Sequence, residues 1–231
     1  MNRAAAIAFL QGQYNSKIGL FQEAPNAAPN NFWFFNDLYD AELAIGYVPG
    51  RAQYPRLPPP RVCVLGGQAF YNTTVLVPNH TVTVSTVGQN QILTEAPNLT
   101  AQPYDVSQYA DIAFHNALNE FNKGNYTPAQ TLLTQAEAMW DGTGWHDAPY
   151  NANPAGGYQT YKCALYLIAL RILGVKGRFQ AENQQVISNA QVMNRSGFAN
   201  QQGGVSTAYT LGNWWAGDVN IETTSLCIFS G

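Results

Sequence analysis

Residues 158–174 read YQTYKCALYLIALRILG, and this stretch decides the predicted fold. Apolar side chains occupy nearly every face of a helix over residues 158–173, and Gly174 follows as a stop signal. A helix that is apolar all round is buried on most sides. Residues 180–193 are instead polar with one apolar stripe, formed by Val186, Ile187, Ala190 and Met193. We therefore expect an inner helix followed by an outer helix.

A helical hairpin is predicted upstream of this pair. Its second helix spans 128–140, where Thr127 is a good N-cap, Pro128 fits the first helical position and Gln130 completes a capping box. Its first helix is expected to begin at Asp105 and to end near Asn122, just before Gly124. Shorter helices are expected at Ala4–Gln13, Phe34–Ile45 and Ile221–Phe229.

The texture changes between residues 58 and 95, where β-branched residues partly alternate with polar ones. Turn dipeptides that contain glycine or proline, Gly66-Gly67, Pro78-Asn79 and Gly88-Gln89, divide this region into four candidate strands. They are Arg61–Leu65, Thr73–Val77, His80–Val87 and Gln91–Thr94. The chain is therefore interpreted as one mainly α domain over 1–231, with a small antiparallel β insertion at about 58–95.

Composition restricts the function more than it defines it. Charged residues make up 11% of the chain, and the formal net charge is −3, so no basic surface for nucleic acid is expected. The longest apolar run, Cys163 to Leu173, is too short to span a membrane. A surface rich in Asn, Gln, Thr and Tyr is typical of secreted proteins, and we expect an extracellular or cell-surface location.

The cysteines have no metal-binding spacing, and the sequence predicts neither a metal site nor a cofactor. Cys163 and Cys227 lie in apolar helical segments and are expected to be buried thiols, while Cys63 falls in the β-rich region. Asn-x-Ser/Thr sites are frequent and favour a glycoprotein. They begin at Asn72, Asn79, Asn98, Asn125 and Asn194.

A weak internal repeat runs through the helical part. Residues 19–23, 144–147 and 197–200 each place glycine, an apolar residue and then polar ones after a helix, and each leads through a loop to an inner helix. The chain resembles the α/α-toroid proteins, which include six-hairpin glycosidases, polysaccharide lyases and sugar epimerases. GLFQEAPNAAPNNFW at 19–33 and MWDGTGWHD at 139–147 are also similar to segments of secreted archaeal proteins. Because few hairpins are evident, the resemblance implies a shortened or open toroid.

Acidic residues at the loop–helix junctions are the candidate catalytic groups. Asp37 and Glu222 fall in the first turns of expected inner helices, and Asp147 closes the Trp145-His146-Asp147 loop. In a toroid, equivalent loops converge on one cleft, where two carboxyl groups suit glycoside hydrolysis. The competing interpretation is that each acid only caps a helix.

Aromatic and amide side chains in the same loops are the candidate sugar-binding groups, because aromatic faces stack on sugar rings and amides bond to hydroxyls. They are Trp33, Asn36, Trp145, His146, Tyr158, Tyr161, Trp214 and Trp215.

The favoured function is therefore a secreted glycoside hydrolase acting on a polysaccharide or oligosaccharide, with Glu222 paired with Asp37 or Asp147. A polysaccharide lyase is a second enzymatic interpretation, with Tyr161 or His146 as base and Lys162 or Arg171 as the nearby cation. The first alternative to the hydrolase, ahead of the lyase, is a non-catalytic extracellular glycan-binding or structural protein of a cell surface or filament.

Overall fold

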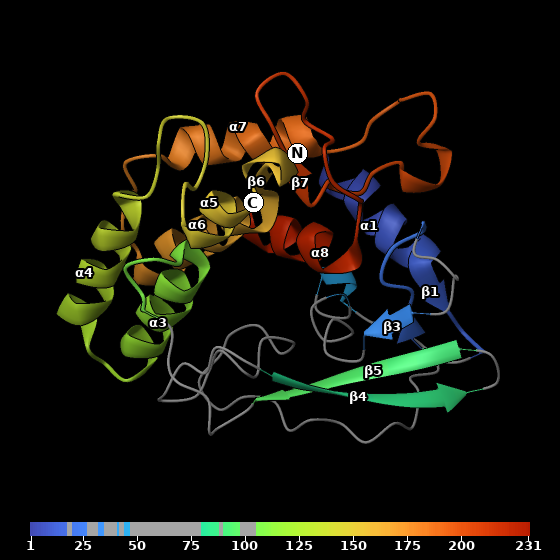
Figure 1. Ribbon diagram of the computed structural model, residues 1–231, viewed down its shortest axis with the longest axis horizontal. Helices are drawn as coiled ribbons and strands as arrows, with labels where there is room; N and C mark the ends of the chain where they lie inside the picture. The colour runs from blue at the N-terminus through green and yellow to red at the C-terminus, as the bar shows by residue number, and fades with distance from the viewer. Residues whose placement is uncertain are drawn as a thin grey trace.

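The structure is a computed structural model that describes residues 1–17, 20–26, 32–34, 41, 44–46, 80–87, 90–97 and 105–231. At 20, 32–34, 80–87 and 90–97 only the backbone is described. The chain is mainly helical, with seven α-helices, one three-stranded sheet and two short two-stranded ones within these residues (Figure 1). None of the described helices is long and apolar enough to cross a membrane.

Helix α6, Thr160–Leu173, lies in the centre of the main core, as its sequence predicts. Ten of its residues, from Thr160 to Leu170, are buried, and Gly174 ends it with a φ of 67°, in the left-handed region that favours glycine. Helix α8, Ile221–Ser230, packs along α6 and is buried over most of its length. These two helices form the inner layer of the described molecule (Figure 1).

Helix α7, Gln180–Ala190, is an outer helix, which confirms the second half of the predicted pair. Val186, Ile187 and Ala190 are buried against α6, while the opposite face is exposed. The helix ends earlier than predicted because the chain becomes extended: Gln191 bridges to Val205, and the Val192 N–H donates to the Gly204 carbonyl. Met193, predicted to be in the apolar stripe, is exposed instead.

Helices α3, Ala110–Asn122, and α4, Tyr126–Glu137, form the predicted hairpin, but both starts were wrong. Asp105 does not begin α3 because its carboxylate accepts bonds from Ser107 and from the Gln108 side chain, and these local bonds compete with a helix. Helix α4 begins before Thr127, so the predicted capping box does not form.

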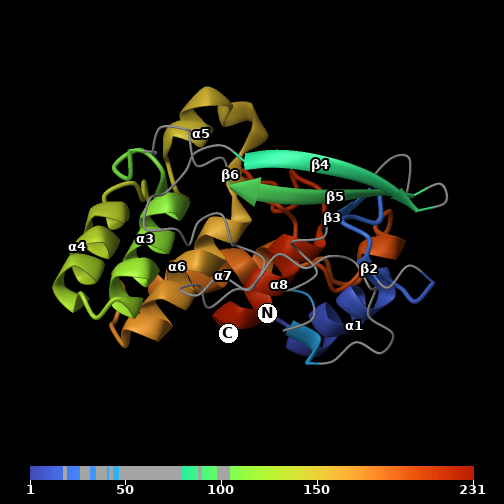
Figure 2. The same cartoon turned by 90° about the horizontal axis from the view of Figure 1, so that it is seen from below.

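Helix α1, Arg3–Gln13, matches its predicted range and lies at the opposite end from the α3–α4 hairpin (Figure 2). Phe9 and Leu10 bury against Phe21 and Ile228 in a second core, and α1 contacts α8. A two-stranded ribbon of β1, Tyr14–Asn15, and β2, Leu20–Phe21, follows α1. Ala41, Ala44 and Ile45 are helical, as predicted for the end of the helix Phe34–Ile45.

The sheet confirms part of the β insertion. Strands β4, His80–Val87, and β5, Asn90–Pro97, pair antiparallel along their full length. The third strand, β3, Phe32–Phe34, pairs parallel with β5 and comes from outside the insertion. Phe34 therefore ends a strand rather than beginning a helix, because the aromatic run Phe32–Phe34 suits a strand. The predicted strands at 61–65 and 73–77 lie outside the described residues.

Short elements connect the helices around the candidate site. They are α5, Ala148–Ala152; the 3₁₀ turns η2, Pro154–Gly156, and η3, Ala199–Gln201; and the paired strands β6, Tyr158–Gln159, and β7, Ala208–Tyr209.

Candidate functional site

Three helices carry a candidate functional side chain at the same position of their first turn. Asp111 is the second residue of α3, Tyr161 the second of α6 and Glu222 the second of α8. The Tyr161 hydroxyl donates a hydrogen bond of 2.8 Å to Asp111 Oδ2. The helix starts therefore bring a carboxylate and a phenol from different hairpins into direct contact.

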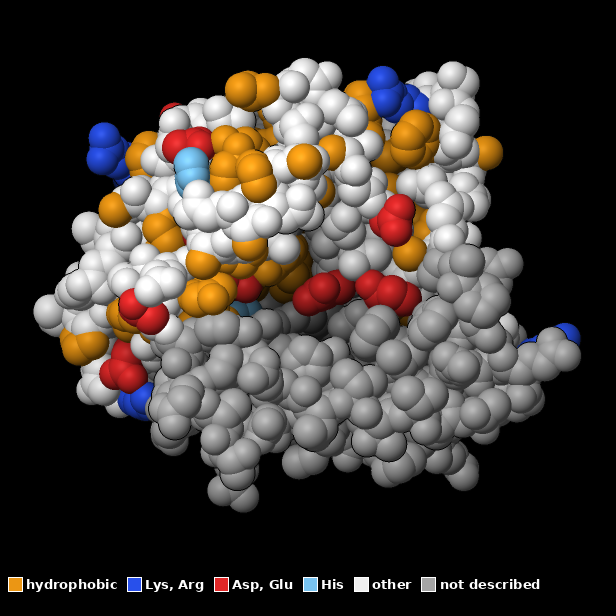
Figure 3. Space-filling model, viewed as in Figure 1, with side chains coloured by type: hydrophobic (Ala, Val, Ile, Leu, Met, Phe, Trp, Pro, Cys, Tyr) orange, Lys and Arg blue, Asp and Glu red, His pale blue; other side chains and the backbone are white. Residues whose placement is uncertain are grey.

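Tyr161 and Glu222 line one cavity of about 270 Å³. Its wall is made mainly of uncharged hydrogen-bonding groups and backbone. The lining residues are Pro149, Asn153, Gly156, Gly157, Gln159, Tyr161, Thr207, Ala208, Asn220, Glu222 and Thr223. In the view of Figure 1, acidic side chains gather around a hollow near the middle of the molecular surface (Figure 3). A polar cavity with a carboxylate suits a ligand rich in hydroxyl groups.

The start of α8 is held in place by Asn220. Its side-chain oxygen accepts from the Thr223 N–H at 2.9 Å, which caps the helix, and its amide donates to Glu23 Oε1 at 2.8 Å. The Ile221 N–H also donates to the Glu23 carbonyl at 2.9 Å. Glu222 therefore projects from a helix start that is fixed to a distant part of the chain.

Gly157, which lines the cavity, has no room for a side chain. Its φ is +80°, and a Cβ there would lie 2.4 Å from the Tyr209 carbonyl oxygen. Glycine is therefore required where β6 meets β7 beside the cavity.

Asp111 is a candidate site residue that the sequence did not predict. The side chain is almost completely buried, and its Oδ1 has no hydrogen-bond partner among the described residues. The signal was its equivalence to Tyr161 and Glu222 at the second position of a helix. That equivalence was hidden because α3 was expected to begin five residues earlier, at Asp105.

Asp147, a predicted catalytic acid, has structural contacts instead. Its Oδ2 accepts from the Ala110 N–H at 3.1 Å, at the start of α3, and from Lys162 Nζ at 2.5 Å. Lys162 and Asp147 are both buried, and Asp147 is not among the residues that line the cavity. The structure thus favours the helix-capping interpretation for this acid.

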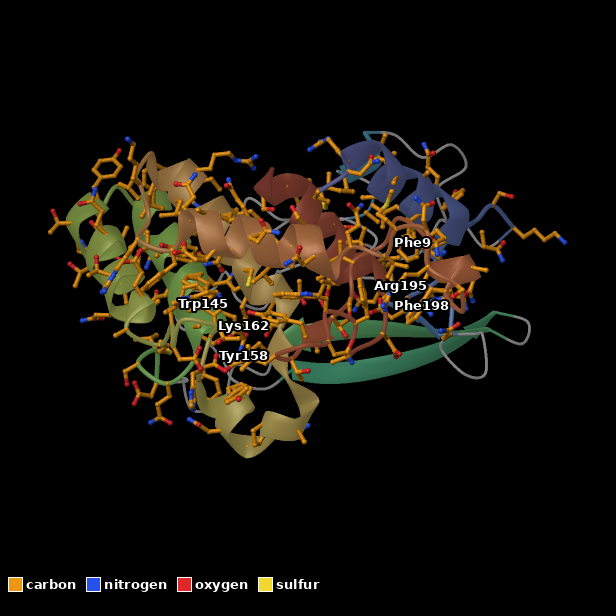
Figure 4. The ribbon with its side chains drawn as sticks, turned by 90° about the horizontal axis from the view of Figure 1, so that it is seen from above. Phe9, Trp145, Tyr158, Lys162, Arg195 and Phe198 are labelled. Atoms are coloured by element: carbon orange, nitrogen blue, oxygen red, sulfur yellow. The ribbon has the colours of Figure 1, made fainter. Side chains whose placement is uncertain are left out.

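Trp145 and Tyr158, predicted to bind sugar, are core residues. Trp145 is 1% exposed and donates from Nε1 to Asn183 Oδ1 at 3.0 Å. Tyr158 stacks on Tyr150 and donates to Asp141 Oδ2 at 2.7 Å. Burial, then the hydrogen bonds to Tyr150 and Asp141, raise the pKa of Tyr158, so its hydroxyl stays protonated. Figure 4 shows both residues in the same half of the molecule as Lys162.

His146 is exposed beside this cluster and outside the cavity lining. Its Nδ1 lies 3.3 Å from Asp141 Oδ2, and its Nε2 lies 2.6 Å from Asn151 Oδ1. These contacts connect the 141–147 loop to α5.

The tryptophan pair divides between two surroundings. Trp214 stacks on Tyr209 with 5.6 Å between ring centroids. The ring of Trp215 is covered by the Arg195 guanidinium, 3.2 Å from its centroid. Arg195 lies far from Trp145 and Tyr158 in Figure 4, close to Phe198 and Phe9. Neither tryptophan lines the Glu222 cavity.

The remaining predicted site residues fall where side chains are not described. Asp37 and Asn36 lie outside the described residues, and Trp33 is described only as backbone, in β3 opposite Ile92. Their roles remain predictions.

The two described cysteines are buried thiols, as predicted. Burial raises the pKa of Cys163 to about 12, so the thiol is not ionised at neutral pH. Burial also lowers the pKa of His115 to about 3, which keeps its imidazole neutral. Cys63 lies outside the described residues.

No protein-family model matches the chain, and no curated protein or solved structure matches it significantly.

Proposed function

We propose that the chain is a glycoside hydrolase that binds an oligosaccharide or polysaccharide in the Glu222 cavity. The observation that supports this most directly is that Glu222 and Tyr161 line one polar cavity, with Tyr161 bonded to the buried Asp111. Uncharged polar groups around these residues suit sugar hydroxyls.

In the proposed reaction, Glu222 protonates the leaving oxygen and then accepts a proton from water. The second group is the Tyr161 hydroxyl, which attacks the anomeric carbon as its proton passes to Asp111, and this forms a covalent glycosyl–tyrosine bond. Water, deprotonated by Glu222, then cleaves that bond, and Asp111 returns the proton to the Tyr161 oxygen. Asp37 remains the alternative second carboxylate that the sequence predicts.

A polysaccharide lyase has less support. That reaction needs a cation near the uronate carboxylate, and the two predicted cations do not serve. Lys162 is buried in its ion pair with Asp147, and Arg171 lies in the last turn of α6, at the other end of the helix from Tyr161.

Non-catalytic glycan binding is the second candidate. The mostly uncharged lining of the cavity supports it, because such groups bind sugar hydroxyls without performing chemistry.

The proposal also covers the arrangement of the helices and the location of the protein. We propose a shortened or open α/α-toroid, supported by the inner α6 and α8 and the outer α7. A secreted or cell-surface glycoprotein is supported by the low charge and by exposed Asn-x-Ser/Thr sites at Asn125 and Asn194.

The test is release of reducing ends from a panel of soluble polysaccharides between pH 4 and 8. Glu222→Gln should lower the rate by about 100-fold or more, because general acid–base catalysis contributes that much. Tyr161→Phe should also lower it strongly. Glu120→Gln, at a partly exposed acid at the far end of α3 from Asp111, is the matched control and should retain activity. Binding without release would favour the glycan-binding candidate, and full activity of Glu222→Gln would reject the assigned role.

A further inference from the structure

A second hollow lies outside the Glu222 cavity, between the start of α7 and the turns at 141–144 and 210–214. Its volume is about 460 Å³. The lining residues are Trp140, Gly142, Thr143, Ala181, Glu182, Gln185, Val186, Leu211 and Trp214. We call this the Trp214 groove. None of its residues lines the Glu222 cavity.

The Trp214 groove is held in shape by Tyr209. One face of the Trp214 ring stacks on the Tyr209 ring with an interplanar angle of 24°. The Tyr209 hydroxyl donates to the Thr143 carbonyl at 2.9 Å, which ties the two turns together. Thr210 and Asn213 exchange backbone hydrogen bonds of 2.8 and 3.1 Å, which close the tight turn that carries Leu211. Because the groove is already formed, its side chains lose little conformational entropy when a ligand binds.

The chemistry of the groove combines aromatic surface with exposed polar side chains. Trp214 is half-buried, and the mostly buried Trp140 also lines the groove. Glu182 and Gln185 are exposed one turn apart on α7 and provide hydrogen-bonding groups at the rim. Leu211 is 81% exposed at the tip of its turn and adds apolar surface to the groove lining. Apolar sugar faces stack on aromatic rings while hydroxyls bond to carboxylates and amides.

We propose that the Trp214 groove is a second carbohydrate site, which binds a neutral pyranose unit against Trp214. The choice of a sugar as ligand rests on the proposed function; the groove itself does not depend on Glu222. Because Glu182 is the charged residue of the lining, anionic sugars such as uronates bind poorly.

A stack of aromatic rings connects the Trp214 groove to the Glu222 cavity. Tyr209 lies 5.6 Å from Trp214 and 5.4 Å from Tyr158, measured between ring centroids. Tyr158 directly follows Gly157, a cavity residue. The groove is therefore placed to hold a more distant sugar of a chain that enters the cavity.

The experiment is affinity electrophoresis of the whole chain in gels that contain a neutral β-glucan, mannan or galactan. Trp214→Ala should raise the Kd by roughly fivefold to tenfold, the size of an aromatic stacking contribution. Trp215→Ala is the matched control, because Arg195 already covers that ring. It should leave the Kd unchanged once circular dichroism shows that both variants fold. Leu211→Ser, at an exposed position, tests the groove without removing a core contact.

Each outcome decides the proposal. Equal losses in Trp214→Ala and Trp215→Ala, no loss in either, or no retardation of the wild type would overturn it. A Trp214→Ala variant that changes only self-association in sedimentation would assign the groove to a second copy of the chain instead. Glu222→Gln should still be retarded, so failure of the hydrolase proposal and failure of the groove proposal give different results.

Discussion

Lys162 and Asp147 form an ion pair that is almost completely removed from solvent, with side-chain exposures of 1% and 0%. Removing one partner leaves a buried charge without compensation. Lys162→Met should therefore lower the free energy of unfolding by about 3–5 kcal/mol. Urea denaturation measures this loss. Lys176→Met, at an exposed lysine, is the control and should change stability little. A loss similar to that control would contradict the structural role of the pair.

The carboxylate of Asp141 should make the stability of the folded chain fall at acid pH. Burial raises its pKa, but bonds from Tyr158, Gly144, Thr143 and His146 outweigh burial, and the net shift is downward. A lowered pKa in the folded state contributes stability above the unfolded value of about 3.9, and this is lost as pH falls through the folded pKa. The melting temperature of Asp141→Asn should therefore fall below that of the wild type at pH 6, and the difference should shrink near pH 2. A difference that does not change with pH would contradict the assignment.

The role of a site residue could be predicted only where local sequence determines its surroundings. Glu222 lies in the first turn of a helix whose start was correctly predicted, and it does line a cavity. Asp147 also lies at a loop–helix junction, yet its carboxylate bonds to the Ala110 N–H and to Lys162. Both partners lie outside the local sequence of Asp147, so no local pattern points to them. A carboxylate's function depends on these tertiary partners, and no local pattern records them.

At the level of elements, burial was predicted better than boundaries. The apolar run of α6 marks an inner helix because its pattern admits no solvent-exposed face. The starts of α3 and α4 were wrong because side-chain bonds among Asp105, Ser107 and Gln108 compete with the helix, and because Tyr126 joins α4 without a side-chain cap. Helix ends depend on such small local differences.

The cap of α8 is a test at this level. Asn220→Ala removes the acceptor for the Thr223 N–H and the donor to Glu23, so unfolding should become easier by about 1–2 kcal/mol. Asn220→Asp keeps the acceptor and should restore the cap in part. Thermal or urea unfolding measures both. Asn2→Ala, which removes the exposed cap of α1, should cost less because no second bond of this kind is lost. Equal stability of Asn220→Ala and wild type would contradict the role of the cap.

For the whole molecule, the sequence correctly predicted a mainly helical chain with a small antiparallel β element. It could not predict that β3 would come from residues 32–34, because a parallel pairing with β5 joins segments far apart in the chain. The contact of Tyr161 with Asp111 was equally hidden, because it requires the correct start of α3 and the packing of α3 on α6. Tyr161 and Glu222, in contrast, were both expected at one cleft, and both line the same cavity.

The small number of charges gives a prediction for the whole molecule. Among the described residues the ion pairs are Lys123–Glu120, His146–Asp141 and Lys162–Asp147. The first two are partly exposed and each contributes roughly 0–1 kcal/mol, while the third is buried and little affected by salt. Because 1 kcal/mol shifts Tm by about 2–4 °C in a chain of this size, loss of both exposed pairs should move the Tm by no more than about 8 °C between low salt and 1 M sodium chloride. Sodium chloride is used because sulfate strengthens apolar burial and would raise the Tm for another reason. A Tm that moves by more than about 10 °C would mean that exposed charges stabilise the fold far more than these pairs allow.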